Sequence, residues 1–554
     1  MTPPRRVDRA TAVAAVLVAL ALVVPIAGAF RQPGAPMEEG KLLVAAELVL
    51  DGEVPHRDFE HFYGPADVWA VAAGFAVLGH SVAAERAVGV AYVVLLVGCV
   101  FVLARRVGRV PAALAAVFAG YVLLPFGVHA YSWTAAVGLL LLAVVLVLRA
   151  TEPDRAGRSL SLALAAGASG GLALLYRADL AVAVALVAAA MWSRLTPAQR
   201  LRGLLGGLAT AVVPYLVHVA TAGIGAAWRG MVTDTLFRLR DGRALPMPPP
   251  GGALTAWLDL AAPEPSKSRL LPDPARVTQL RAFFWMTVLA IVATAAVAIW
   301  AALRRRSERD TAWLLCIGAV LVAMAPQMLQ RADATHVRFV ACVALPLAPI
   351  VVARAIAMVD RRMPQSAAAA ELVVLTTVAL VLAVPYYTAR LAGTVVQRGI
   401  GRVDTARVGI DGRTFPVIDP LAPDATALLA RLDAIGPPAG RLFVGPVDLR
   451  LANYSDAFLY FVLGERYRPA SFFLESNPGI ANATGSTLAA DIARADVLVL
   501  STEYDNWDEP NASRDPGPDA PVRAVADGFC TVAEIGRYRI LLRAGSVLCA
   551  NGAT

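Results

Sequence analysis

Residues 11–30 read TAVAAVLVALALVVPIAGAF, an apolar run without a single charged residue. A helix needs about 20 apolar residues to cross the hydrocarbon core of a bilayer, so this run predicts a membrane span. The chain has 554 residues, of which 58% are hydrophobic and only 17% are charged. A soluble protein of this length would expose too much of that apolar content. We therefore predict a polytopic α-helical membrane protein.

The apolar runs predict about eleven spans of sufficient length. They lie at residues 11–30, 83–104, 110–127, 132–149, 160–176, 179–193, 203–224, 282–303, 311–329, 337–356 and 370–390. The first run also resembles a secretory signal peptide, with PIAGAF as a cleavage site, but a retained span makes the later count consistent. We therefore expect the first span to be part of the mature chain.

The charges of the short loops predict the orientation of these spans. With a cytoplasmic N-terminus, the loops on the cytoplasmic side are all rich in arginine, as the positive-inside rule requires. These loops are 105–109, 149–158, 194–202, 304–310 and 354–362. The net charge of +8 is thus a topology signal, and no nucleic acid partner is expected. The Ala-, Val-, Leu- and Arg-rich, Lys-poor composition suggests a GC-rich bacterial genome. Together with the predicted spans, this leads us to expect a multi-pass protein of a bacterial cytoplasmic (inner) membrane.

This orientation places all the long polar segments on the outer face. We expect a membrane module at residues 1–390, with an acidic outer loop at 31–82 and a proline-rich loop at 225–281 that is a candidate lid. A small extracytoplasmic α/β domain is expected at 391–554. Its predicted strands are 441–444, 497–501 and 538–542, and its predicted helices are 424–435 and 485–494.

The acidic outer loop carries the densest polar stretch in the first half of the chain. Residues 37–69 read MEEGKLLVAAELVLDGEVPHRDFEHFYGPADVW. Leucines and alanines at helical spacing predict an amphipathic helix over 39–50, which Asp51-Gly52 ends. A second apolar helix is expected at 66–78, and it is short for a span.

The carboxylate pair Glu38 and Glu39 opens the first of these helices. Acids favour the positive end of the helix dipole, so the pair could simply stabilise an exposed helix start. The alternative is that one carboxylate acts as a general base on an acceptor hydroxyl. The sequence favours neither of these interpretations over the other.

Other polar residues of the outer face are candidates for binding a phosphate. Arg57, beside Asp58, is one, because a guanidinium matches phosphate oxygens in a fork, whereas His61 and Glu60 are expected to be salt-bridged loop residues. Arg177 and Asp179 lie between two spans, where they either pair with each other or bind substrate.

A second outer segment is unusually basic for its side of the membrane. Arg331, Asp333, His336 and Arg338 cluster between two spans, where the positive-inside rule disfavours arginine. An anionic head group would explain them. In contrast, His129, Tyr131 and Trp133 are typical of aromatic residues that anchor a protein at the membrane interface.

The five cysteines divide between the two regions. Cys99, Cys316 and Cys342 lie in predicted spans and are expected to be packing residues. Cys530 and Cys549 flank the last predicted strand of the outer domain, which is an oxidising location in bacteria. We therefore hypothesise a Cys530–Cys549 disulfide.

The motifs of the first outer loop resemble those of the GT-C-fold glycosyltransferases. The resemblance rests on the Glu38-Glu39 pair, on the run Gly52-Glu53-Val54-Pro55-His56-Arg57-Asp58-Phe59 and on the turn Tyr63-Gly64-Pro65. Arg331-Ala332-Asp333-Ala334-Thr335-His336 adds an outer-face motif of the same kind. The nearest relatives by this resemblance are bacterial proteins related to protein O-mannosyltransferases and to the lipid A aminoarabinose transferase.

This resemblance implies an inverting transfer of a sugar from a polyprenyl-phosphate donor to an envelope glycan, lipid or protein. Glu38 takes the position of the general base and Glu39 would orient it, although the family's usual pair is Asp-Glu. Arg57, Arg331 and Arg177 would hold the phosphate. Tyr63, Asp58, Asp179 and Asp333 are further candidates. Relatives differ in their use of a divalent metal, so one is possible, but no metal-binding residues are assigned.

Two rival functions are compatible with a polytopic protein of this kind. A transporter or flippase for a lipid-linked or anionic substrate would carry charges at the midplane and internal repeats, and neither is found. A non-catalytic envelope scaffold is the other alternative. The chain has no Walker loop, no Rossmann glycine fingerprint and no CxxC motif, so a soluble nucleotide-sugar enzyme is not supported.

Overall fold

The computed structural model places the chain in two compact units. It describes residues 9–250, 273–304, 307–359, 371, 374–376, 378, 384, 386–435, 440–451, 454–505 and 509–551. Unit 1 comprises residues 1–30, 89–216 and 246–403. Unit 2 comprises residues 31–88, 217–245 and 404–554. Each unit therefore draws on three separate segments of the chain, and no single cut in the sequence divides them.

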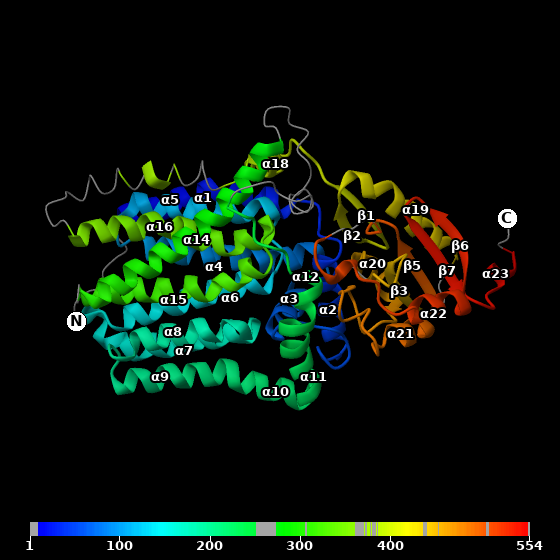
Figure 1. Ribbon diagram of the computed structural model, residues 1–554, viewed down its shortest axis with the longest axis horizontal. Coiled ribbons are helices and arrows are strands. Elements are labelled where there is room, and N and C mark those ends of the chain that lie inside the picture. Colours follow the sequence, from blue (N-terminus) through cyan, green and yellow to red (C-terminus); the bar gives the residue numbers. More distant parts are fainter. Residues whose placement is uncertain are drawn as a thin grey trace. The chain divides into compact units, whose positions relative to one another are not determined.

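Unit 1 is a helical bundle, and Figure 1 shows its helices side by side. The helices are α1 (Arg9–Phe30), most of α4 (Val82–Ala104), α5 (Arg109–Leu123), α6 (Ser132–Ala150), α7 (Ser159–Tyr176), α8 (Ala181–Trp192), α9 (Pro197–Gly207), the start of α10 (Val213–Ala222), α14 (Asp273–Leu303), α15 (Glu308–Gln330), α16 (Ala334–Val359) and α18 (Tyr386–Gly399). Among its packed pairs are α6 with α7, α7 with α9, α14 with α15, α16 with α5 and α1 with α18.

Among the described residues, nine helices are long and apolar enough to cross a membrane. They coincide with nine of the predicted spans. The span predicted at 179–193 corresponds to a shorter apolar helix, Ala178–Trp192. The span predicted at 370–390 lies largely outside the described residues.

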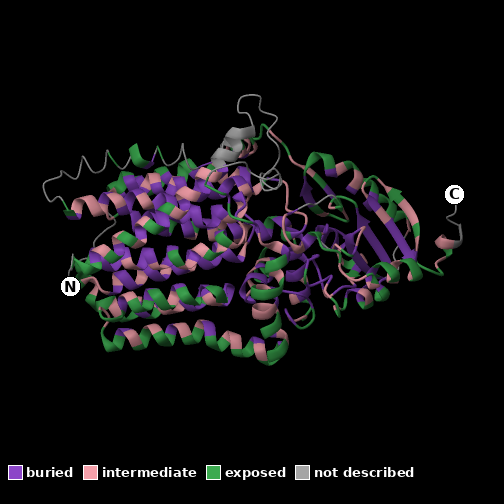
Figure 2. Ribbon diagram, in the orientation of Figure 1, coloured by how far each residue is buried: buried purple, intermediate pink, exposed green. Residues whose placement is uncertain are grey.

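Burial separates the central helices of unit 1 from the peripheral ones (Figure 2). The apolar windows of α6 and α16 are each 72% buried, whereas that of Pro197–Ala222 is only 17% buried. Leu204, Leu205 and Leu216 of that peripheral helix are exposed although they are apolar. A helix that is apolar on its exposed face needs a lipid environment, so the chain is a multi-pass membrane protein.

Unit 2 is built around a five-stranded mixed sheet of order β4-β3-β5-β7-β6. Its strands are β3 (Gly440–Pro446), β4 (Tyr467–Pro469), β5 (Val497–Ser501), β6 (Phe529–Ile535) and β7 (Tyr538–Arg543). β3 pairs in parallel with β4 and β5, while β7 pairs antiparallel with β5 and β6. All five residues of β5 are buried, as expected for a strand that is covered on both faces.

Unit 2 also contains further helices and a separate two-stranded hairpin. They are α2 (Glu38–Leu50), α3 (Ala66–Leu78), α11 (Ile224–Trp228), the π-helix η5 (Arg229–Arg238), α12 (Leu239–Arg243), the hairpin β1 (Ala406–Ile410) and β2 (Arg413–Val417), α19 (Ala422–Ile435), α20 (Phe458–Leu463), α21 (Leu488–Arg494), α22 (Ala520–Gly528) and α23 (Val547–Asn551). The predicted strands and helices of the outer domain are confirmed as β3, β5, β7, α19 and α21. The strands β1, β2, β4 and β6 were not predicted.

The two helices of the acidic loop are confirmed as α2 and α3. Gly52 follows α2 with a φ of 90°, a left-handed conformation that glycine adopts without strain and that ends the helix. The start of α2 is fixed to the C-terminal segment, since Phe458 N donates to Pro36 O at 2.9 Å. A Cβ on Gly40 would lie 2.2 Å from Phe458 N, so only glycine allows this close approach.

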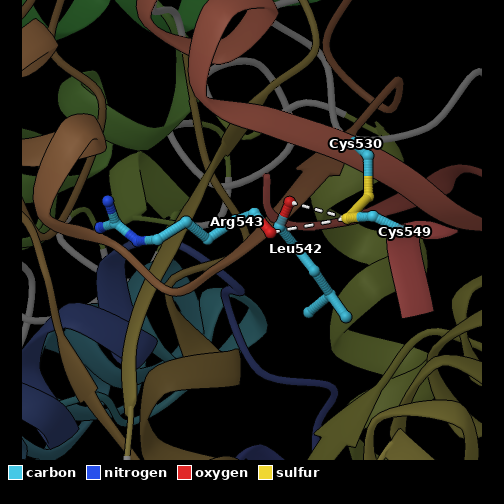
Figure 3. Close-up of a disulfide and its surroundings, with 4 residues drawn as sticks. All are labelled: Cys530, Leu542, Arg543 and Cys549. Atoms are coloured by element: carbon cyan, nitrogen blue, oxygen red, sulfur yellow. Dashed lines mark hydrogen bonds between the residues drawn. A yellow bond between two sulfur atoms is a disulfide. The ribbon is translucent and has the colours of Figure 1, made fainter. Parts of the chain in front are cut away.

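The hypothesised disulfide is present between Cys530 of β6 and Cys549 of α23 (Figure 3). The two Cα atoms are 5.9 Å apart, and Cys549 Sγ lies near the carbonyl oxygens of Leu542 and Arg543. The bond joins the C-terminal helix to β6, which is an edge strand of the sheet. The other cysteines, Cys99, Cys316 and Cys342, are free and buried, as predicted for packing residues.

Candidate active site

The two carboxylates at the start of α2 lie in opposite environments. Glu38 is exposed, whereas Glu39 is fully buried. Successive residues of an α-helix point about 100° apart, so one of two neighbours can face the protein interior while the other faces solvent. The two carboxylates are therefore not equivalent, because Glu38 is accessible to solvent and Glu39 is not.

Arg86 of α4 holds the carboxylate of Glu39. Its Nε donates to Oε1 at 2.7 Å and its Nη2 donates to Oε2 at 2.9 Å. Its Nη1 donates to the carbonyl oxygen of Gln32 at 2.8 Å. The Arg86 side chain is itself buried, so the pair is shielded from water. A carboxylate with both oxygens bound to a guanidinium is a poor proton acceptor but a firm anchor for the helix start.

Tyr504 of the C-terminal segment interacts electrostatically with Glu38, and Asp456 is bonded to Tyr504. The hydroxyl of Tyr504 donates to Asp456 Oδ1 at 3.2 Å, and Asp456 comes just before the Phe458–Pro36 contact. Burial holds the pKa of Tyr504 well above its ordinary value, and the charges of Asp456 and Glu38 raise it further. Burial also raises the pKa of Asp456, to about 6. No local motif marks these two residues, so the sequence did not identify them.

One turn along α2, Lys41 forms a buried network. Its Nζ pairs with Glu475, and this pairing raises the pKa of Lys41 although burial alone would lower it. Asn477 donates to Glu475 and to Glu60 Oε2, both at 3.1 Å. Burial raises the pKa of Glu60 well above its ordinary value, which favours its neutral form. This network binds the acidic loop to the C-terminal segment.

Arg57 and Asp58 form an internal pair of the acidic loop. Arg57 Nε and Nη2 donate to the two Asp58 oxygens at 2.9 and 2.7 Å, and Nη1 donates to Thr221 O at 3.0 Å. This pairing lowers the pKa of Asp58. Asp58 also accepts from Val54 N at 2.7 Å, so it shapes the loop as well.

Tyr63 lies beside a cluster of three histidines. His56 Nε2 bonds the carbonyl oxygen of Tyr63 at 3.1 Å, and His56 Nδ1 bonds His218 Nε2 at 2.9 Å. His61 pairs with Asp67 at 2.9 Å, in keeping with the loop role expected for it. Burial lowers the pKa of His56 to about 2, so this ring is neutral at ordinary pH.

In unit 1, Arg177 and Asp179 form the internal pair that was one of the two predicted alternatives. Arg177 Nε and Nη2 donate to Asp179 at 2.9 and 2.7 Å, and Nη2 also reaches Gln327 at 3.4 Å. The guanidinium lies 5.0 Å from the centre of the Trp133 ring. The pair links the segment between α7 and α8 to α15.

The second basic segment of unit 1 is organised by Asp333. Its carboxylate accepts from Arg331 Nε at 2.7 Å and from the backbone N–H of His336 at 2.8 Å, and it contacts His336 Nδ1 at 2.9 Å. Burial alone would raise the pKa of Asp333, but His336 and Arg331 hold it below its ordinary value. Arg338 is buried, with its guanidinium 4.0 Å from the centre of the Phe126 ring.

A cavity of about 1620 Å³ opens in unit 2, away from Glu38. Arg57, Asp58 and Glu60 line it together with residues of η5 and of the segment from 464 to 494. Glu38 is not among its lining residues. The predicted base and the predicted phosphate ligand Arg57 therefore do not share this cavity.

No protein-family model and no curated protein matches the chain. The crystal structure of ArnT from Cupriavidus metallidurans bound to undecaprenyl phosphate is 16% identical in sequence and covers 97% of this chain and 99% of that chain, with a TM-score of 0.52. The apo structure of the same protein is 16% identical, covers 96% of this chain and 98% of that chain, and has a TM-score of 0.46. At this level of identity the match concerns the fold. The chain therefore has the GT-C fold of the lipid A aminoarabinose transferase ArnT.

Proposed function

We propose that the protein is a membrane glycosyltransferase that moves a sugar from a polyprenyl-phosphate donor to an acceptor hydroxyl, with inversion at the anomeric carbon. The observation that carries this proposal is the contrast between exposed Glu38 and buried, arginine-bound Glu39 at the start of α2. The GT-C fold gives the context, and the ArnT match includes a structure with undecaprenyl phosphate bound. The acceptor is an envelope glycan, lipid or protein.

The reaction assigns a distinct task to each carboxylate. Glu38 accepts the proton of the acceptor hydroxyl while the acceptor oxygen attacks the anomeric carbon from the side opposite the phosphate. The bond between that carbon and the phosphate oxygen breaks, and the polyprenyl phosphate leaves with the electron pair. Glu39 stays bound to Arg86 and holds the start of α2 in place, so that Glu38 is presented in one orientation.

Arg331 and His336 are the proposed ligands of the phosphate. Both contact the carboxylate of Asp333, which orients them and keeps the imidazole close to a negative charge. Donors held in this way stabilise charge that develops on a leaving phosphate. Arg338 and Arg177 are further candidates, although Arg177 already has its bonds to Asp179.

Glu39 and Glu85 each offer a carboxylate oxygen, and these two atoms lie within 4.8 Å of one another, which is close enough to hold a metal ion. Both oxygens of the Glu39 carboxylate also accept hydrogen bonds from Arg86, whose positive charge balances the acid. We therefore route no step through a divalent ion. Transfer that survives an excess of chelator would agree with this proposal, and activity that needs added Mg²⁺ or Mn²⁺ would contradict it.

The proposed function is tested with the purified full-length protein in nanodiscs. The protein is given polyprenyl phosphates that carry different radiolabelled sugars, and release of free polyprenyl phosphate is followed with transfer of the label. Glu38→Gln should abolish transfer, while Asp527→Asn, an exposed acid on α22, is the matched control. Full transfer by Glu38→Gln, or movement of an intact donor across the bilayer without cleavage, would overturn the proposal.

A further inference from the structure

The cavity in unit 2 is larger than an ordinary small-molecule site. Its volume of about 1620 Å³ exceeds the roughly 300–1,000 Å³ that is usual for ligand pockets. Its wall comes from the end of α2 and the following loop, from η5 and from the segment between β4 and α21. All the lining residues belong to unit 2, so the cavity is a property of that unit.

The charges that line the cavity almost cancel. Seven arginines and eight acids contribute to its wall. Most of the arginines are paired there: Arg413 with Glu47 at 2.6 Å, Arg57 with Asp58 at 2.7 Å and Arg238 with Asp234 at 3.3 Å. An ionic ligand would have to displace one partner of such a pair, which costs the interaction that it replaces. The wall therefore offers no net attraction to a charged ligand.

The same wall suits a ligand that is neutral and rich in hydroxyl groups. Each ion pair places donors beside acceptors, and a sugar hydroxyl both donates and accepts. The half-buried Phe472 adds an apolar surface for the C–H face of a sugar ring. Its position is fixed on both sides, because Phe472 N donates to Asp491 at 3.0 Å and Phe472 O accepts from Glu60 N at 2.8 Å.

The position of the cavity indicates which part of a ligand it could hold. α2 contributes Val44, Glu47 and Leu48 to the wall. Val44 lies about 9 Å along the helix axis from Glu38, and Val44 and Glu47 point away from the face that carries Glu38. A ligand seated here thus keeps its bound portion at a distance from the proposed base.

We propose that this cavity binds a neutral oligosaccharide segment of the acceptor, at a distance from the hydroxyl that receives the sugar. The proposal rests on the transferase function above and names its acceptor as a glycan chain. A monosaccharide is too small to fill the cavity. Acceptors of several residues gain affinity from it, and short acceptors do not.

Binding is measured with the full-length protein in nanodiscs by titration calorimetry, without donor. The probes are linear hexasaccharides of glucose, mannose, galactose and arabinose, with a galacturonate hexasaccharide as the anionic probe. At least one neutral hexasaccharide should bind more tightly than its monosaccharide and more tightly than the anionic probe. Failure of all four neutral probes, or stronger binding of the anionic one, would overturn the proposal.

Variants locate the binding in the cavity. Phe472→Ala should weaken binding of the neutral hexasaccharide about tenfold or more. Since Phe472 also packs against the core of unit 2, Arg229→Ala, at an exposed residue of η5, gives a second variant that leaves that core intact, and it should weaken binding too. Arg523→Ala, an exposed position of α22 outside the cavity, is the control and should bind normally. Normal binding by both cavity variants would refute the assignment.

The proposed transferase function and the proposed oligosaccharide site can be refuted separately. Glu38→Gln should bind the neutral hexasaccharide as the unmodified protein does, because Glu38 does not line the cavity. Binding without any transfer by the unmodified protein would therefore refute the proposed function and leave the binding site standing. In the transfer assay, Arg229→Ala should raise the KM of a hexasaccharide acceptor and leave that of a disaccharide unchanged. An equal effect on both acceptors would count against a remote site.

Discussion

Arg86 donates one hydrogen bond to each carboxylate oxygen of Glu39, at 2.7 and 2.9 Å, while neighbouring Glu38 is exposed. Glu39→Gln removes the charge that the buried Arg86 binds, which should cost about 3–5 kcal/mol of stability. Glu38→Gln should leave the thermal unfolding midpoint unchanged and lower turnover by a factor on the order of 10² to 10⁴.

Thermal unfolding and single-turnover transfer of the two variants separate these effects. The assignment would be reversed if Glu39→Gln kept normal stability and lost transfer while Glu38→Gln lost stability alone. Glu39→Asp is the matched control, since it keeps the charge but shortens the side chain by one methylene. Its thermal unfolding midpoint should lie between those of Glu39→Gln and Glu38→Gln.

The Lys41–Glu475 pair should behave as a buried ion pair between the acidic loop and the C-terminal segment. Lys41→Met alone leaves an unpaired buried acid and should destabilise the protein by about 3–5 kcal/mol. The double change Lys41→Met with Glu475→Leu removes both charges and should recover much of that loss. A double-mutant cycle of chemical unfolding measures the coupling, and strictly additive effects would contradict it.

Asp456 should make stability depend on pH. Burial raises its pKa from 3.8 to about 6, so the folded state holds a proton that the unfolded state has already lost between these values. The contribution of Asp456 to stability is therefore largest below about pH 4, falls as the pH rises through this window and stays lower above it, by roughly 3 kcal/mol.

Asp456→Asn has no such proton to lose. Its unfolding free energy, compared with that of the unmodified protein between pH 4 and pH 8, should lack this fall. Tyr504, which bonds Asp456, keeps its hydroxyl in the variant and is the neighbouring group to check by Tyr504→Phe. Parallel pH profiles for Asp456→Asn and the unmodified protein would show that Asp456 does not titrate in this window.

Loss of the disulfide should destabilise unit 2. Cys530 and Cys549 are 19 residues apart, and a closed loop of that length corresponds to about 3 kcal/mol. The double variant Cys530→Ser with Cys549→Ser should unfold at lower temperature and become insensitive to dithiothreitol. Peptide mapping of the unmodified protein without reductant should yield the linked pair, and two free thiols there would contradict the bond.

Local signals predicted the helices well, whereas contacts between distant segments were beyond the sequence. α2 and α3 were predicted because helical periodicity and the breakers Asp51-Gly52 and Gly64-Pro65 are local features. Strand β6 was not predicted, because Thr531 and Glu534, which are exposed, interrupt its apolar residues.

The candidate site shows the same division. Sequence patterns identified Glu38 and Glu39 as a pair but left open which carboxylate was free. The answer depends on Arg86 and on Asp456 and Tyr504, which approach α2 only in the folded chain. Neither residue type nor spacing distinguishes Asp456 from the many exposed acids of the C-terminal segment. What distinguishes Asp456 is its contact in the folded protein with a segment that is hundreds of residues away in the sequence.

The division of unit 2 into three segments of the chain also constrains the number of membrane crossings. We expect unit 2 to lie on one side of the bilayer, so the chain should cross it an even number of times between its first segment, 31–88, and its second, 217–245. Five long apolar helices lie between these segments in the described chain, so the short helix Ala178–Trp192 is the expected sixth crossing. Parity thus favours a crossing by a helix whose length alone does not decide whether it spans the bilayer.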